Sequence, residues 1–116
     1  MNIKQHLFST LNNKDIKNLT SDKKVYFIHA NNPTPPYIEY QVIAERGAEF
    51  SEGKENYSYY LIQIDIFSKT DYTNLEENIK KIMLEAGYSR DNAVDLYENK
   101  TGLYHKAMRF NISLPC

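Results

Sequence analysis

Hydrophobic and polar positions alternate most regularly between Tyr57 and Lys69, and this pattern predicts a long β-strand. One set of alternating positions is apolar throughout, whereas the other set is mixed. We therefore expect one face of the strand to lie against a core and the other to carry both polar and large apolar groups. The core face consists of Tyr60, Ile62, Ile64 and Ile66, and the mixed face of Tyr59, Leu61, Gln63, Asp65 and Phe67.

Two segments have the three-to-four-residue period of amphipathic helices. The stronger one covers residues 72–86, where Thr73 and Glu76 have the spacing of a capping box and Gly87 stands at the position of a C-terminal cap. The weaker one covers residues 2–12. The apolar positions are Leu75, Ile79, Ile82, Met83 and Ala86 in the first segment, and Ile3, Leu7, Phe8 and Leu11 in the second.

Shorter apolar runs predict the remaining strands of the chain. The resulting order is helix, three strands, helix, two strands. This order predicts one α+β domain over residues 1–116, with a mostly antiparallel sheet of about five strands and two helices packed on one face. Besides residues 57–69, the expected strands are Val25–Ile28, residues 37–44, residues 93–98 and Leu103–Leu114.

Three prolines lie within four positions, at Pro33, Pro35 and Pro36. Proline has a fixed φ and no backbone N–H, so this stretch is excluded from a helix or a central strand. Residues preceding proline are also held in extended geometry. The segment is therefore expected to be a stiff extended connector that leads into the strand beginning at Tyr37.

Residues 45–56 differ from their surroundings because they contain two glycines, four glutamates and only Arg46 and Lys54 as basic residues. The composition predicts a flexible, solvated hairpin loop, longer than a hairpin requires. An acidic loop can also bind a basic partner, so an interface role stays open beside the solvated loop. On the sheet, large apolar groups on the mixed face suggest subunit contact. The candidate interface residues are Glu45, Glu49, Phe50, Glu52, Glu55, Tyr59 and Phe67.

The overall charge changes the range of expected partners. The 116 residues carry a formal net charge of −1, which argues against a generic nucleic-acid binder. The first 24 residues hold five lysines and two aspartates but lack the interleaved aromatic residues that stack bases. No apolar run is long enough to span a bilayer, and no signal peptide is visible. We expect no membrane and no sequence-specific nucleic acid among the partners.

The residues that often perform chemistry are scattered along the chain. His6, His29 and His105 each stand alone, which predicts exposed or strand-edge histidines rather than a metal site. The glycines form no phosphate-binding pattern. Cys116 is the single cysteine, so no intramolecular disulfide is possible. We therefore expect no catalytic residue, no metal, no cofactor and no enzymatic activity.

Taken in order, several segments resemble the tail-terminator proteins of long-tailed bacteriophages, also called tail-completion or head–tail joining proteins. The similarity covers nearly the whole chain and lies in the ordered set of segments. These are Leu7-Phe8-Ser9-Thr10-Leu11, Val25-Tyr26-Phe27-Ile28, Pro35-Pro36-Tyr37-Ile38-Glu39-Tyr40, Leu61–Lys69 with the helix after it, the strand around Tyr97, and Leu103–Phe110.

The resemblance implies a structural virion protein of the tail or neck, assembled in the cytoplasm of a bacterial host. Such a protein forms a homo-oligomeric ring, a hexamer, on the finished tail tube. It stops tube polymerisation and joins the tail to the head connector. Its implied partners are further copies of itself, the tail-tube protein and the head–tail connector protein.

Two other classes of protein stay open on the sequence. The first is a neck or head-completion protein of the same virion, which would bind filled heads rather than tails. The second is a small cytosolic ligand-binding or regulatory α+β module, which would be a stable monomer or dimer with a closed pocket.

Overall fold

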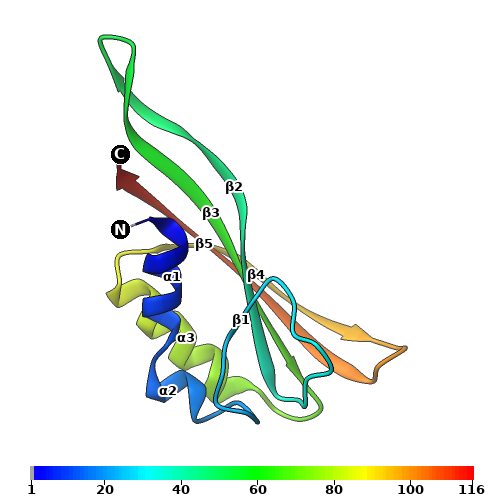
Figure 1. Cartoon of the computed structure of the whole chain (residues 1–116). Coiled ribbons are helices and arrows are strands. Elements are labelled where there is room, and N and C mark those ends of the chain that lie inside the picture. The colour runs from blue at the N-terminus through cyan, green and yellow to red at the C-terminus, as the bar shows by residue number, and fades with distance from the viewer. Residues whose placement is uncertain (1) are drawn as a thin grey trace.

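The computed structural model describes residues 2–116, and the side chains of Glu49 and Phe50 lie outside this description. Figure 1 shows the whole chain as one curved sheet with its helices on one side. The helices are α1 (Ile3–Leu11), α2 (Lys14–Lys17) and α3 (Thr73–Glu85); the strands are β1 (Tyr26–Phe27), β2 (Tyr37–Ser51), β3 (Lys54–Ser68), β4 (Ser89–Glu98) and β5 (Leu103–Pro115).

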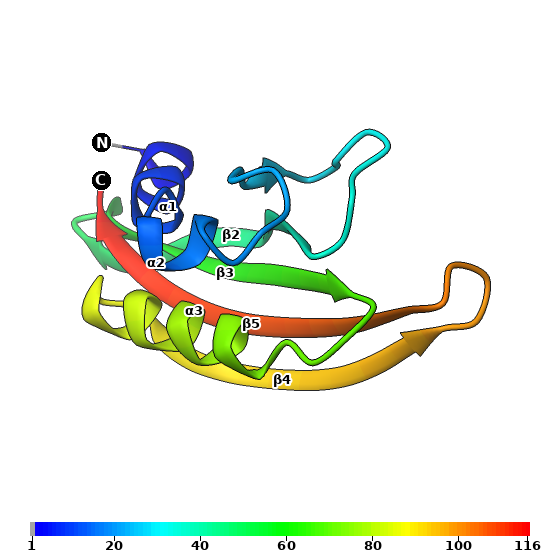
Figure 2. The ribbon, with the colours of Figure 1, turned by 90° about the horizontal axis from the view of Figure 1, so that it is seen from below.

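The five strands form one sheet in the order β1-β2-β3-β5-β4. Figure 2 shows β2, β3, β5 and β4 side by side in this order. The pair β1–β2 is parallel, and the other three pairs are antiparallel. The α+β class and the mostly antiparallel sheet of five strands are therefore confirmed. The short connections β2–β3 and β4–β5 explain two of the three antiparallel pairs, because adjacent strands joined by tight turns must run in opposite directions.

The core lies between the helices and one face of the sheet. In the register, Ile62 lies between Val42 and Phe110, and Ile64 lies between Tyr40 and Met108. The predicted core face of the longest strand is therefore confirmed. The helices contribute Ile3, Leu7, Leu11, Ile16, Leu75, Ile79 and Met83, all of them buried.

Three helices are present where the sequence predicted two. The extra helix, α2, is one turn long, and its N-cap Asn13 accepts a hydrogen bond from the Asp15 amide at 2.8 Å. The predicted capping box of α3 is wrong, because Tyr72 is the N-cap and Asp71 accepts the hydrogen bonds from Thr73 instead.

The predicted cap at Gly87 is confirmed. Gly87 has a φ of +100°, its amide donates to the carbonyl of Leu84, and the Tyr88 amide donates to Met83. This pair of bonds is the Schellman arrangement, which needs a residue that tolerates the left-handed region. Glycine therefore ends α3 and turns the chain toward β4.

The strand bounds differ from the expected ones in two places. Only Tyr26 and Phe27 of the run 25–28 are paired, because Ile28 has a φ of +66° and leaves the strand. Strand β4 begins at Ser89 rather than at residue 93, and an irregularity between Arg90 and Ala93 interrupts its register with β5. A bulge of this kind hides the two-residue period from sequence analysis.

The proline connector leads into β2 at Tyr37, as expected, but the expectation that it is extended throughout is wrong, because Asn32, just before Pro33, has a φ of +48° and the chain bends there. It is fixed to the segment after α2, because the Ser21 amide donates to the carbonyl of Pro36 at 3.0 Å and the Ser21 hydroxyl donates to that of Pro35 at 2.6 Å. The connector is therefore anchored at the end that starts the sheet.

The predicted loop over residues 45–56 is wrong. Strand β2 continues to Ser51 and β3 starts at Lys54, so that only Glu52 and Gly53 turn the chain. Both have positive φ, +52° and +77°, as a type I′ hairpin turn requires. We name residues 45–56 the β-arm.

Candidate functional site

The sheet face that points away from the helices carries an ordered row of rings. Tyr37 of β2, Phe67 of β3 and His105 of β5 lie side by side across three strands. The ring centroids of Tyr37 and Phe67 are 4.8 Å apart, those of Phe67 and His105 are 4.3 Å apart, and both pairs are stacked. Each such contact stabilises by about 0.5–1.5 kcal/mol beyond the area it buries.

A chain of polar side chains lies beside this row. The Arg109 Nε donates to Gln63 Oε1 at 3.0 Å, and Gln63 Nε2 donates to Asp65 Oδ1 at 2.9 Å. His105 Nε2 lies 2.7 Å from the same Asp65 oxygen. Asp65 is only 5% exposed although it stands on the open side of the sheet. The hydrogen bonds from Gln63 and His105 compensate this carboxylate for the water it has lost.

A shallow groove of about 390 Å³ runs between this polar chain and the edge strand β4. Asn92, which lies in the irregular part of β4, and Val94 line one side of the groove. Its other walls are the side chains of Gln63, Leu96, His105 and Arg109. Arginine and amide groups on an open surface suit hydrogen bonding to a polar or acidic partner.

The second feature is the β-arm, which extends the molecule beyond the body. The pairing of β3 with β5 ends at Tyr57 and Pro115, so the two strands of the arm continue past their neighbour (Figure 1). The chain measures 52 × 28 × 24 Å and has a radius of gyration of 15.1 Å. A compact chain of this length would have about 13 Å. The arm therefore presents surface that the body does not cover.

The candidate interface residues fall into separate groups in the structure. Glu45, Glu52 and Glu55 are exposed on the β-arm. Tyr59 is half-buried, and the guanidinium carbon of Arg46 lies 4.3 Å from its ring centroid. The prediction that Phe67 is an exposed contact residue is wrong, because its neighbours in the row leave it 8% exposed. Glu49 and Phe50 belong to β2, but their side chains lie outside the described part of the chain.

The three histidines have different surroundings. His29 is exposed, with 77% of its side chain open to solvent. His6 Nδ1 lies 2.7 Å from the hydroxyl of buried Tyr88, and burial raises the pKa of that phenol. The expectation of exposed or strand-edge histidines is wrong for His6, which is half-buried on α1, and for His105, which is half-buried on the central strand β5. Its contact with Asp65 escaped sequence analysis because 40 positions separate the two residues.

A buried lysine organises the opposite face, at the edge near α3. The Lys106 Nζ lies 3.1 Å from Glu76 and 3.1 Å from Asp95, and Tyr72 donates to Asp95 at 2.6 Å. The hydrogen bond from Tyr72, and then that from Lys106, lowers the pKa of Asp95. A lysine with two carboxylates is a structural clamp between α3 and the strands β4 and β5.

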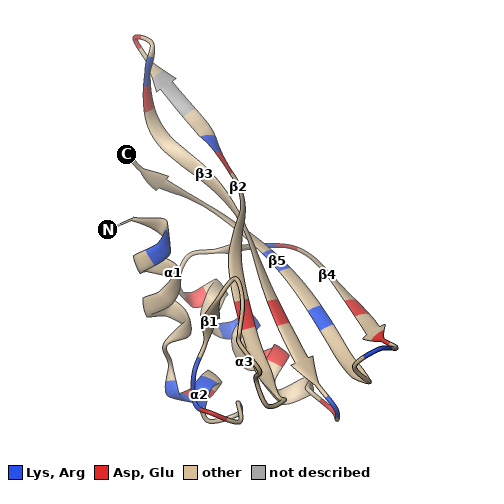
Figure 3. Ribbon diagram, turned by 45° about the vertical axis from the view of Figure 1, so that its right-hand side comes forward, with Lys and Arg blue, Asp and Glu red and all other residues tan. Residues whose placement is uncertain are grey.

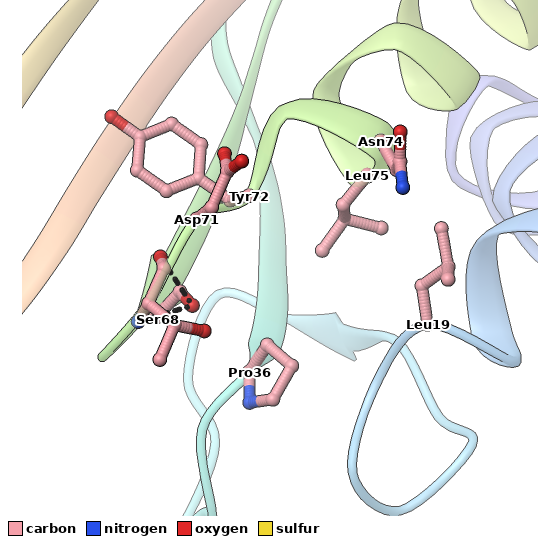
Figure 4. Close-up of a pocket in the computed structure, with 8 residues that line it drawn as sticks. Leu19, Pro36, Ser68, Asp71, Tyr72, Asn74 and Leu75 are labelled. Carbon is pink, nitrogen blue, oxygen red and sulfur yellow. Dashed lines mark hydrogen bonds between the residues drawn. The ribbon is translucent and has the colours of Figure 1, made fainter.

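A small cavity of about 150 Å³ lies where the proline connector meets the start of α3 (Figure 4). Leu19, Pro36 and Leu75 form its apolar side. The Ser68 hydroxyl on its polar side donates to the Thr70 carbonyl at 3.0 Å and accepts from the Thr70 amide at 3.2 Å. The hydroxyl thus closes a local turn, and this gap is part of the packing of the connector.

Searches of the described residues for two further kinds of site gave negative results. Across residues 2–116, no group of three or more His, Cys, Asp or Glu side chains is placed to hold a metal ion. No helix in that range has the length and apolar character needed to cross a membrane. Comparison of the sequence with protein-family models finds no matching family, and comparison with curated proteins finds no match.

Proposed function

We propose that this protein is a structural subunit of a bacteriophage virion. In this proposal it forms a homo-oligomeric ring, a hexamer, on the end of the tail tube, stops tube polymerisation and forms the joint to the head connector. Its partners are further copies of the same chain, the tail-tube protein and the connector protein. Its place is the tail or neck of the virion, after assembly in the host cytoplasm.

The observation that carries the proposal is the β-arm. A two-stranded arm that leaves the body exposes both of its faces and its outer edge. The outer edge of β2 beyond Tyr40 pairs with no other strand in the described part of the chain. Free strand edges and projecting surfaces are sites where chains associate. A protein whose task is assembly has a use for such an arm.

The element order gives further support. The fold has the order of elements that the hydrophobic pattern predicted, and in which the resembling segments follow one another, apart from the one-turn helix α2. A ring also requires a heterologous interface, in which one patch meets a different patch of the next subunit. The β-arm at one end of the molecule and the helical layer beside the body supply two different surfaces (Figure 1).

Electron microscopy of the purified protein with the tail-tube protein of the same virus tests the proposal. We expect rings, and tubes that carry one ring at an end and stop growing. Tubes that elongate equally with and without the protein would refute it. Binding to DNA-filled heads but not to tails would instead assign the protein to the neck.

A further inference from the structure

Three exposed glutamates of the β-arm form no ion pair within the described part of the chain. Residues 45–56 hold four glutamates against Arg46 and Lys54. Glu45, Glu52 and Glu55 are exposed, and within the described residues none of the three forms an ion pair. Glu55 accepts a hydrogen bond from Ser58. The arm therefore has net negative charge available for a partner.

A surface of opposite charge lies around α2 and β1. Residues 14–24 hold four lysines against two aspartates. Lys17, Lys23 and Lys24 surround a hollow of about 270 Å³ next to Phe8 and Val25. Lys17 donates to the Asn12 side chain and Lys23 to the Asn18 carbonyl, and over the described ranges neither pairs with a carboxylate.

Apolar groups lie beside these lysines. Phe8 is 46% exposed, and Lys4 stands one turn before it on the same face of α1. The Lys4 Nζ lies 5.3 Å from the ring centroid of Phe27, which is itself exposed. We name Phe8, Lys17, Lys23, Lys24 and Phe27 the lysine surface. Exposed apolar groups that lie together on a surface often mark a site where a partner binds.

The backbone beside the lysine surface is strained. Ile28 follows Phe27 directly, has a φ of +66° and is 55% exposed. A β-branched side chain rarely adopts this conformation, and such outliers cluster at functional sites. The Ile28 amide donates to the Tyr40 carbonyl at 2.8 Å, which fixes the strained turn to the sheet. The result is an apolar side chain held out toward solvent next to the cationic patch.

We propose that the β-arm of one copy docks on the lysine surface of a second copy. This inference deepens the proposed ring and rests on it, since it names the two patches of the heterologous contact. The arm tip and α2 lie at opposite ends of the molecule (Figure 3). The arm of a chain therefore meets the lysine surface of a neighbour, and repetition of this contact closes a ring or extends a filament.

The free edge strand β4 is a second surface on which the arm of a neighbour could dock. The charges of the two surfaces distinguish between these contacts. The outer edge of β4 could add a strand to a neighbour's arm, but β4 holds Asp91, Asp95 and Glu98 against Arg90 alone. Two acidic edges repel each other, whereas the lysine surface attracts the arm. Docking on the lysine surface is also expected to weaken as salt screens the charges.

Charge-reversal variants test the contact by sedimentation of the protein alone. Glu45→Lys/Glu52→Lys/Glu55→Lys reverses the arm, and Lys17→Glu/Lys23→Glu/Lys24→Glu reverses the lysine surface. Each variant alone is expected to raise the dissociation constant of self-association about tenfold or more. An equimolar mixture of the two is expected to associate again, because each reversed patch then finds its complement. A matched control for the lysine-surface variant, Lys69→Glu/Lys81→Glu/Lys100→Glu, changes net charge by the same amount in the same direction and should associate like the wild type.

Zero-length cross-linking reports the contact even where association is weak. A carbodiimide activates a glutamate carboxyl, and a lysine amine in contact then forms an amide as the activating group leaves as a urea. In a mixture of ¹⁴N- and ¹⁵N-labelled chains, we expect mixed-isotope links from Glu52 or Glu55 to Lys17, Lys23 or Lys24. Links from Lys54 of the β-arm to Asp91 or Glu98 of β4 instead, or self-association that neither reversed variant changes, overturn the inference.

The outcomes separate this inference from the proposed function. Rings that cap tail tubes but survive both charge reversals refute the arm contact and keep the function. Arm-to-lysine links in a protein that never binds tubes refute the function and keep the contact. A wild-type chain that gives no intermolecular link and stays monomeric, alone and with tube protein, refutes both.

Discussion

Replacing Lys106 by methionine tests whether the buried lysine clamp stabilises the fold. The Lys106 Nζ lies 3.1 Å from both Glu76 and Asp95, and the residue is 8% exposed. Methionine keeps the length and the apolar stem of the side chain, so the variant removes the charge with little loss of packing. The two carboxylates are left without their shared cation.

The expected loss lies between two limits. Removing one partner of a fully buried pair costs about 3–5 kcal/mol, and removing one of an exposed pair about 0.2–1 kcal/mol. Lys106 is buried, but 59% of the Asp95 side chain is open to solvent and can regain water. We therefore expect a decrease of about 1–2 kcal/mol in the free energy of unfolding at neutral pH. Urea unfolding with an unchanged m-value measures it, and exposed Lys69→Met should stay within about 0.5 kcal/mol of wild type.

The pH dependence of this loss follows from two shifted groups. The pKa of Asp95 is lowered in the fold, so its stabilisation is present above the unfolded value of about 3.9 and is lost as the pH falls through the lower folded value. Burial lowers the pKa of Lys106, but the hydrogen bonds to Glu76 and Asp95 outweigh burial and raise it overall. Its stabilisation is therefore present below about 10.4 and is lost as the pH rises through the folded value.

The stability difference between wild type and Lys106→Met should thus be flat from about pH 5 to 9 and shrink at both ends. A double-mutant cycle with Asp95→Asn isolates the pair, and the two changes should be clearly non-additive. The reasoning is refuted if the variant is as stable as the wild type at pH 7, or if the difference does not shrink in acid.

Three further changes test the fold. Phe67→Ala should lower the free energy of unfolding by about 2–3 kcal/mol, because it opens a gap between Tyr37 and His105, and Phe67→Leu should cost less; equal urea midpoints contradict this. Gly87→Ala should lower it by about 1–2 kcal/mol through backbone strain alone, since φ is +100° and a Cβ there meets no atom closer than 3.9 Å; an unchanged melting temperature argues against it. Glu52→Asn should slow amide hydrogen exchange in the β-arm, because asparagine tolerates the positive φ of the turn; faster exchange contradicts the turn assignment.

The sequence predicted elements that have a buried face. The helix after β3 and the strand β3 itself were recognised because their apolar residues repeat with the period of the element. The Gly87 cap was recognised for a related reason, since glycine is the residue that tolerates the φ of +100° found there. Local pattern and tertiary structure agree at these places.

The β-arm was missed for a physical reason. A ribbon that leaves the body has no buried face, so its residues show no hydrophobic alternation, and glutamate and glycine are poor strand formers. Its structure depends on cross-strand pairing and on the turn at Glu52 and Gly53, and the preferred turn sequences there are Asn-Gly or Asp-Gly. Glu-Gly at residues 52 and 53 is a weak form of this signal.

The hydrogen-bonded side chains on the open face of the sheet could not be predicted without the register between β3 and β5. Asp65 was assigned to the mixed face of its strand, and His105 lay in another predicted strand. Their contact arises because Asp65 pairs with Ala107, and His105 lies two residues before Ala107 on the same face of the sheet, diagonally across from Asp65. Diagonal neighbours on a sheet are within reach of long side chains. Pairing the two predicted strands would have brought the residues together.

The structure leaves three acidic candidate contact residues, Glu45, Glu52 and Glu55, open to solvent and covers an apolar one. The sequence placed Phe67 among the contact residues, but its stacked neighbours already cover it, so burial by a partner would gain little there. Glu45, Glu52 and Glu55 of the β-arm and Lys17, Lys23 and Lys24 near α2 form no ion pair within the described part of the chain. A contact between these two patches satisfies both, and its strength depends on salt. In the proposed ring, the end of a growing tube would bring copies of the chain close together and so favour this contact.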